Sequence, residues 1–110
     1  MSLLRSTLVL SLSVMSPIVA LAAPSGDQQR TRGATVFSEN GCQHCHKIRQ
    51  NGGTKGPDLS GVGRRLSEGQ IRTQILEGGH TMPPFVEILQ KSETDDLVAY
   101  LRSCRDKKGR

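Results

Sequence analysis

The chain has 110 residues, a formal charge of +5, one Tyr, two Phe and no Trp. This length accommodates one domain, and a small chain with so few large apolar residues needs a metal, a disulfide or a cofactor to complete its core. A basic surface suits an acidic protein or an anionic membrane, whereas the lack of aromatic residues interleaved with the basic ones argues against a nucleic-acid partner.

The first 22 residues have the pattern of a secretory signal peptide. Arg5 precedes a Leu-, Val- and Ser-rich apolar run that ends in the A-x-A-like triplet at positions 20–22. We predict cleavage after Ala22 and an exported, periplasmic domain over residues 23–110. The alternative is an uncleaved membrane anchor, but the run is shorter than the roughly 20 apolar residues of a spanning helix. We therefore expect no transmembrane span after signal removal.

The first predicted helix begins at about Asp27 and carries Gly33, Ala34 and Phe37 along one face, before a stop signal at Asn40-Gly41. A glycine-rich segment over residues 41–65 follows, for which we predict largely irregular structure. Irregular segments of this length are uncommon in a compact domain unless they wrap around a bound group.

The sequence Cys42-Gln43-His44-Cys45-His46 opens that segment, and C-x-x-C-H is the attachment motif of c-type haem. Two thiols separated by two residues can each add across one haem vinyl group, which delivers His46 to the iron as the proximal ligand. We predict one covalently bound haem c per chain. His44, inside the turn, is expected to point to solvent.

Two other uses of the cysteine pair are open at this stage. A zinc site would draw on His46, His80 and Cys104, but zinc usually takes four ligands at paired spacings. A thioredoxin-like redox pair needs a βαβ context, and the sequence has no strand-like alternation. Haem remains the prediction, with zinc or a disulfide as the alternatives.

A second helix is predicted after Ser67, because Ser67 and Gln70 form a capping box, and it ends at Gly78-Gly79. Met82 follows on a loop that Pro83-Pro84 keeps out of a helix. Outside the signal peptide it is the only methionine.

Met/His ligation is one of the modes of c-type cytochromes and raises the reduction potential. We predict Met82 as the second axial iron ligand. The alternatives are that Met82 fills the core or that His80 is the ligand, although His80 is more readily explained as an exposed loop residue.

Residues 86–90 are expected to add a short helical turn, and Ser92 is the predicted N-cap of a final helix. Its buried stripe comprises Leu97, Tyr100, Leu101 and Cys104. As the third cysteine, Cys104 is predicted to be a small buried residue, with an intermolecular disulfide as the alternative. A basic tail begins at about residue 105.

These features resemble the class I cytochrome c family in its short bacterial form, from Gly33 to about Ser103. In that family a helix with Gly and an aromatic residue four positions later crosses a C-terminal helix with Leu and an aromatic residue three positions on. Gly33, Phe37, Leu97 and Tyr100 match these positions. The resemblance implies an all-α cytochrome c fold, with three to four short helices wrapped around one covalently bound haem and long loops.

The resemblance also implies two contacts around the haem. The carbonyl of Pro57 would accept the Nδ1 proton of His46, which orients a ligating imidazole. Arg64 or Arg65 would pair with a haem propionate, although either can equally be a solvated surface arginine.

The implied function is that of a one-electron carrier rather than an enzyme, because protein ligands on both sides of the iron leave no place for substrate. It would shuttle electrons between a dehydrogenase or reductase donor and an oxidase-type acceptor. The alternatives are an electron-transfer subunit of a dehydrogenase or sulfur-oxidising complex and, less favoured, a peroxidase or gas sensor with an open distal side.

We expect redox protein partners with acidic docking patches and a monomer, with a Cys104-linked dimer as the alternative. Exposed basic residues either steer that docking or serve solubility alone: Lys47, Lys55, Arg64, Arg65 and Lys91.

Overall fold

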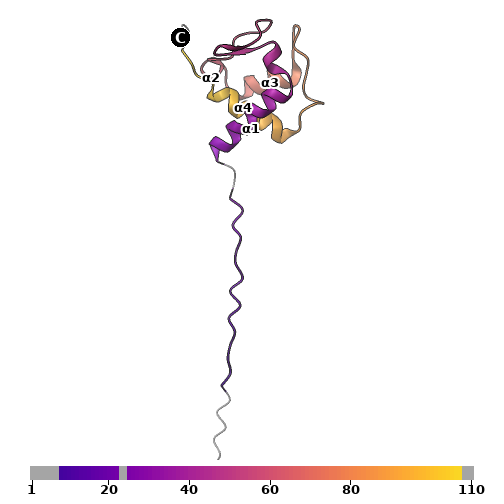
Figure 1. The fold of residues 1–110 in the computed structure, drawn as a ribbon. Helices are drawn as coiled ribbons and strands as arrows, with labels where there is room; N and C mark the ends of the chain where they lie inside the picture. Colours follow the sequence, from indigo (N-terminus) through magenta and orange to yellow (C-terminus); the bar gives the residue numbers. More distant parts are fainter. Residues whose placement is uncertain (1–7, 23–24, 108–110) are drawn as a thin grey trace, which may run out of the picture.

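The computed structural model describes residues 8–22 and 25–107. Residues 8–22 form no helix or strand and run away from the domain as an extended segment (Figure 1), in which the large apolar side chains are 74–96% exposed. Arg5, Ala23 and the last three residues of the basic tail lie outside the described residues. Within the described part of the chain, no helix combines the length and apolarity needed to cross a membrane.

Four α-helices, one 3-10 helix and one short hairpin make up the regular structure of residues 25–107. The helices are α1 (Gly26–Glu39), the 3-10 helix η1 (Cys42–His44), α2 (Val62–Arg65), α3 (Glu68–Glu77) and α4 (Lys91–Ser103). The hairpin pairs β1 (Lys47–Ile48) with β2 (Asn51–Gly52) in antiparallel register, Lys47 opposite Gly52. The predicted all-α class with long loops is confirmed.

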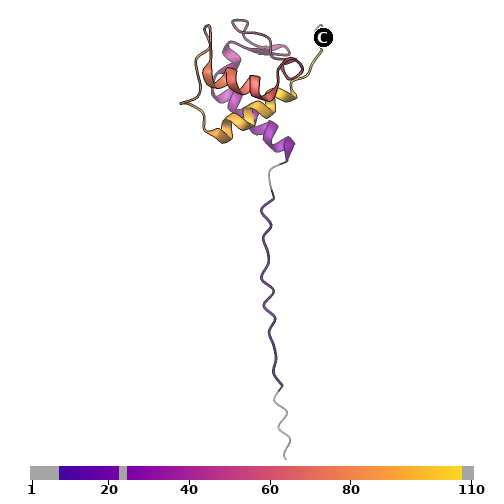
Figure 2. The ribbon, with the colours of Figure 1, turned by 180° about the vertical axis from the view of Figure 1, so that it is seen from behind.

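The crossing of α1 and α4 forms the centre of the domain, as Figures 1 and 2 show from opposite sides. Gly33 makes the close approach possible, because a Cβ at this position would collide with the backbone oxygen of Asp96 and lie 2.6 Å from Cβ of Tyr100. Next to it, the rings of Phe37 and Tyr100 meet edge to face, with centroids 5.8 Å apart. Arg32 adds a two-pronged ion pair to Asp96.

Local capping signals explain where the helices begin, with one correction. Ser67 forms the predicted capping box with Gln70 at the start of α3. Ser92 is not the N-cap of α4, however. The helix begins at Lys91 after Gln90, because the Glu93 carboxylate accepts a hydrogen bond from the Gln90 backbone N–H at 2.8 Å.

The segment over residues 41–65 is more regular than predicted, since η1, the hairpin and α2 all lie within it. Arg49 supplies a positive φ of 58° in the hairpin turn. The short helix α2 is held from outside, because the Gly63 N–H donates to the Cys104 carbonyl at 2.8 Å. Within residues 86–90 the expected short turn forms, since the Ile88 and Leu89 N–H groups both donate to the Phe85 carbonyl at 3.0 Å, and it does not continue as a helix.

The core is small. Its buried apolar residues are Val36, Phe37, Val62, Ile71, Ile75, Leu89, Leu97, Val98, Leu101 and Cys104. Among the described residues, no large side chain is less than 2% exposed. Leu59, Leu66 and Phe85 are only partly buried against this cluster. Cys104 is buried as predicted, although it lies just after the end of α4.

Candidate functional site

The C-x-x-C-H residues form a tight turn directly after α1. Gly41 takes the left-handed conformation, with φ of 71°, and η1 follows it. The His46 N–H then donates to the Cys42 carbonyl at 3.0 Å, which brings the ends of the motif together. Cys42 is partly buried, Cys45 is exposed, and neither forms a disulfide. Burial raises the pKa of the Cys42 thiol, because it disfavours the charged thiolate.

His46 is oriented by the backbone that follows the hairpin. Its Nδ1 lies 2.8 Å from the carbonyl oxygen of Pro57, the contact that the family resemblance implied. Because a carbonyl oxygen only accepts hydrogen bonds, Nδ1 carries a proton in this contact. Nε2 is therefore the ring nitrogen that could bind a metal.

Gly56 is required for this placement of the His46 ring. A Cβ on Gly56 would lie 2.6 Å from Cε1 and 2.8 Å from Nδ1 of His46. The Gly56 N–H also donates to the Cys45 carbonyl at 2.7 Å. The loop before Pro57 is thus tied to the cysteine turn and packs directly on the imidazole.

Met82 lies on a loop fastened to the end of α3. Its N–H and carbonyl exchange hydrogen bonds with Gly79 at 2.9 and 3.0 Å, and the glycines at the helix end have φ of 67° and 141°. The Phe85 N–H then donates to the Ile75 carbonyl at 3.0 Å. Several backbone hydrogen bonds therefore position the partly buried Met82 side chain.

Gln74 is a residue of this site that the sequence analysis did not identify. Its side-chain amide lies within hydrogen-bonding distance of the Met82 sulfur, at 3.7 Å, and of the Gly78 carbonyl, at 3.2 Å. A polar residue in the last turn of an amphipathic helix is ordinarily a solvent-facing position. Nothing in the local pattern distinguishes Gln74 from its exposed neighbours.

The other predicted residues lie outside these contacts. His44 and His80 are both exposed. Arg64 is exposed on α2, and Arg65 donates to the Asp58 carbonyl at 3.0 Å. In residues 8–22 and 25–107, no three His, Cys, Asp or Glu side chains gather as a set that could hold a metal ion.

The residues fit a covalently attached haem. Both cysteine thiols are free to form thioether bonds. Because His46 Nδ1 contacts the Pro57 carbonyl, Nε2 is the nitrogen that could bind iron. Leu59, Leu66 and Phe85 have apolar surface that the protein itself covers only in part. A haem would supply the buried apolar area that so small a core lacks.

Comparison with known proteins identifies the family and the fold. The model of the family described as "Cytochrome C oxidase, cbb3-type, subunit III" matches residues 28–101. Among curated proteins, none matches the sequence.

Two solved structures share the fold. The c-type cytochrome SorU from Sinorhizobium meliloti aligns with a TM-score of 0.62 and 23% identity, over 72% of this chain and 93% of its own. SoxXA from P. pantotrophus aligns with a TM-score of 0.65 and 23% identity, over 77% of this chain and 85% of the matched one. Together they establish that the domain has the cytochrome c fold.

Proposed function

This chain belongs to the cytochrome family described as "Cytochrome C oxidase, cbb3-type, subunit III", and we propose that it is a periplasmic one-electron carrier with His46 and Met82 as axial iron ligands. Membership of this family establishes a c-type cytochrome that binds haem c covalently and transfers electrons. The ligands, the location and the free-carrier role are the parts that we propose. Cys42 and Cys45 hold the haem through thioether bonds in this proposal.

The hydrogen bond between His46 and Pro57 carries the proposal. The 2.8 Å contact specifies the Nδ1–H tautomer, and a bonded Nδ1–H makes Nε2 a stronger donor. The close packing of Gly56 on the ring and the Nδ1 contact with Pro57 hold the imidazole in one orientation, as a metal ligand requires. The same contact gives Pro57 its role as the residue that orients the ligand.

Met82 is the favoured second ligand because its loop is immobilised at both ends. Backbone hydrogen bonds to Gly79 precede the two prolines, and the Gln74 amide contacts the sulfur itself. A methionine that merely filled the core would not need an amide donor at its sulfur. His80, the rival ligand, is exposed and has a positive φ of 53°.

The bound haem supplies an iron that cycles between the ferrous and ferric states. With His46 and Met82 as its ligands, the iron would have no open coordination position for a substrate, and Met82 would raise its potential. Electron transfer between proteins is the chemistry that remains. We propose a dehydrogenase or reductase as the donor and an oxidase-type protein as the acceptor.

Two features support an exported carrier. Residues 1–22 have the signal-peptide pattern, and covalent attachment keeps the cofactor on a protein that diffuses between partners. Arg64 is proposed to approach a haem propionate from α2. The second candidate is a role as the electron-transfer subunit of a dehydrogenase or sulfur-oxidising complex. The two solved structures with this fold, SorU and SoxXA, are 23% identical to this chain, and that likeness concerns the fold alone.

Visible spectroscopy of the exported protein tests the proposal. After acid-acetone extraction the haem should remain on the chain, and it should be lost from a variant with both Cys42→Ala and Cys45→Ala. The ferric protein should show the weak red band of Met-ligated iron, which Met82→Ala removes. His80→Ala is the matched control and should keep the band. A high-spin ferric spectrum in the parent protein would overturn the carrier proposal in favour of an open distal side.

A further inference from the structure

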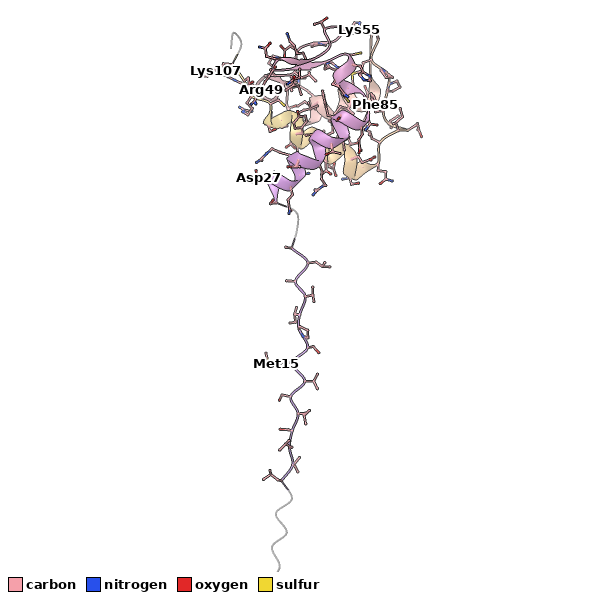
Figure 3. The ribbon with its side chains drawn as sticks, in the orientation of Figure 1. Met15, Asp27, Arg49, Lys55, Phe85 and Lys107 are labelled. Atoms are coloured by element: carbon pink, nitrogen blue, oxygen red, sulfur yellow. The ribbon has the colours of Figure 1, made fainter. Side chains whose placement is uncertain are left out.

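A groove of about 770 Å³ lies on the domain surface between β1, the loop after Pro57, α2 and the segment after α4. Figure 3 shows two of its residues, Arg49 and Lys107, on the same side of the domain, whereas Lys55 and Phe85 lie toward the opposite side. The groove is separate from the Met82 loop, since no residue between positions 66 and 105 lines it.

Positive charge is concentrated in this groove. Its five basic side chains are Lys47, Arg49, Arg64, Arg65 and Lys107, against the two acidic side chains Asp58 and Asp106. All other described residues together carry seven basic and eight acidic side chains. The described part of the domain is therefore positive in the groove and close to neutral elsewhere.

The two acidic side chains of the groove already accept hydrogen bonds from other residues of this chain. Asp106 accepts from Arg49 Nε at 3.0 Å. Asp58 accepts from the Ser60 hydroxyl at 2.6 Å and the Ser60 N–H at 2.8 Å, and these bonds lower its pKa. Neither Arg64 nor Lys107 takes part in an ion pair among the described residues. Both side chains are exposed, and these two carboxylates do not neutralise their charge.

The walls of the groove are held by hydrogen bonds between distant parts of the chain. The Asp106 N–H donates to the Ser60 carbonyl at 2.9 Å, and the Gly63 N–H donates to the Cys104 carbonyl at 2.8 Å. Arg49 N–H donates to the Ser60 hydroxyl at 2.5 Å. A positively charged surface that is preorganised in this way loses little conformational entropy when a partner binds.

We propose that this groove is the docking site for an acidic segment of the redox protein partner. The inference rests on the proposed function and locates the docking surface within it. A concave site suits a protruding carboxylate-rich segment better than a flat lipid surface. Lys47 follows His46 directly and Asp58 follows Pro57, so a partner in the groove lies beside the hydrogen-bonded pair that orients the proposed iron ligand.

The groove differs from the general basic surface expected from sequence. It includes Arg49 and Lys107, and it excludes Lys55 and Lys91. Of these two excluded lysines, Lys55 is exposed and takes part in no ion pair of the described residues, so it serves as the matched control for Lys107. Reversing the charge of Lys107 inside the groove or of Lys55 outside it changes the net charge of the protein by the same amount.

The test uses the haem-loaded protein labelled with ¹⁵N in its ferrous state, and a Glu-rich synthetic peptide at low ionic strength. We expect amide shifts confined to the groove segments, around residues 47–50, 58–65 and 105–107. Lys107→Glu should weaken peptide binding about threefold or more, whereas Lys55→Glu should weaken it much less. Raising the salt concentration should weaken the parent complex.

Three outcomes overturn the docking proposal. They are equal weakening by Lys107→Glu and Lys55→Glu, amide shifts centred outside the groove, and no peptide binding at all. A further arm uses vesicles containing phosphatidylglycerol, and groove-dependent binding to these vesicles without groove-dependent peptide binding would assign the surface to a membrane instead. The parent protein is first checked for the spectrum of Met-ligated iron. Absence of that spectrum in the parent counts against the proposed function, whereas a normal spectrum with misplaced shifts counts against the groove alone.

Discussion

The side-chain amide of Gln74 lies 3.7 Å from the sulfur of Met82, while the same amide nitrogen lies 3.2 Å from the Gly78 carbonyl. One residue in the last turn of α3 thus contacts both the end of its own helix and the proposed iron ligand. The contact connects helix packing to the electronic environment of the sulfur, because an N–H donor competes for electron density that the thioether would give to iron.

Gln74→Leu should lower the reduction potential. Removing the amide donor frees sulfur electron density, which favours the ferric iron. A hydrogen bond worth about 1 kcal/mol corresponds to roughly 40 mV for one electron, so we expect a downward shift of at most a few tens of mV. Spectroelectrochemical titration measures it. Thr73→Val, on the exposed surface of the same helix, is the control, and equal potentials for Gln74→Leu and the parent would show that the contact does not tune the iron.

Features encoded within a few residues were predictable from sequence. The capping box of Ser67 and Gln70 spans four positions and forms as expected. The C-x-x-C-H turn and the α1–α4 crossing at Gly33 rest on strong spacing signals of the family. The N-cap of α4 was predicted two residues late, because Ser92 is the better cap by residue type while Glu93 already caps the backbone of Gln90.

Features that depend on contacts between distant segments were not predictable. The helix α2 has only four residues, and its Gly63 N–H is satisfied by Cys104, 41 positions later. The strands of the hairpin have two residues each, too short for any alternation to be visible. The groove likewise depends on Arg49, Arg64 and Lys107, which only the fold brings together.

Gly33→Ala should destabilise the domain strongly. The new Cβ would collide with the Asp96 backbone oxygen and lie 2.6 Å from Cβ of Tyr100, so α1 and α4 would have to separate. Overpacking of this kind costs about 1–3 kcal/mol or more of unfolding free energy. Thermal or denaturant unfolding of the haem-loaded protein measures the loss.

Gly69→Ala is the matched control for Gly33→Ala. Gly69 lies in the exposed first turn of α3, where the nearest atom to a new Cβ is Ser67 Oγ at 4.0 Å. Replacing a helical glycine with alanine should therefore stabilise the protein slightly, by up to about 1 kcal/mol. If both variants changed the stability alike, the close helix crossing would not be the reason for glycine at position 33.

Asp95→Asn should reduce stability at neutral pH but not in acid. Hydrogen bonds from Lys91 and then Arg72 lower the pKa of the Asp95 carboxyl below its ordinary value of 3.8. A lowered pKa means that the carboxylate stabilises the fold above that ordinary value, and that this contribution is lost as the pH falls through the lowered one. Because the pair is partly exposed, we expect a loss below about 1 kcal/mol at neutral pH.

Urea unfolding of the parent and Asp95→Asn proteins across the acid range checks this dependence. The difference between their unfolding free energies should shrink as the pH falls below the ordinary pKa and vanish once the Asp95 carboxyl is protonated in the folded parent protein. Glu87→Gln, in the exposed turn before α4, is the control, since Glu87 takes part in no ion pair of the described residues. A difference that persists unchanged in acid would show that the two ion pairs are not its source.

Gly56→Ala should disturb the iron site while leaving the helices intact. The new Cβ would lie 2.6 Å from Cε1 of the His46 ring, so the ring or the loop must move and the 2.8 Å hydrogen bond to Pro57 is lost. A misplaced imidazole that no longer donates through Nδ1 is a weaker and less well directed ligand. We expect a high-spin fraction in the ferric spectrum, a changed reduction potential and unchanged far-UV circular dichroism.

Lys55→Ala, on the adjacent exposed position of the same loop, should keep the parent spectrum. If Gly56→Ala also kept it, the glycine would not be what permits the orientation of His46, and the tautomer argument for this histidine as the proximal ligand would lose its structural basis.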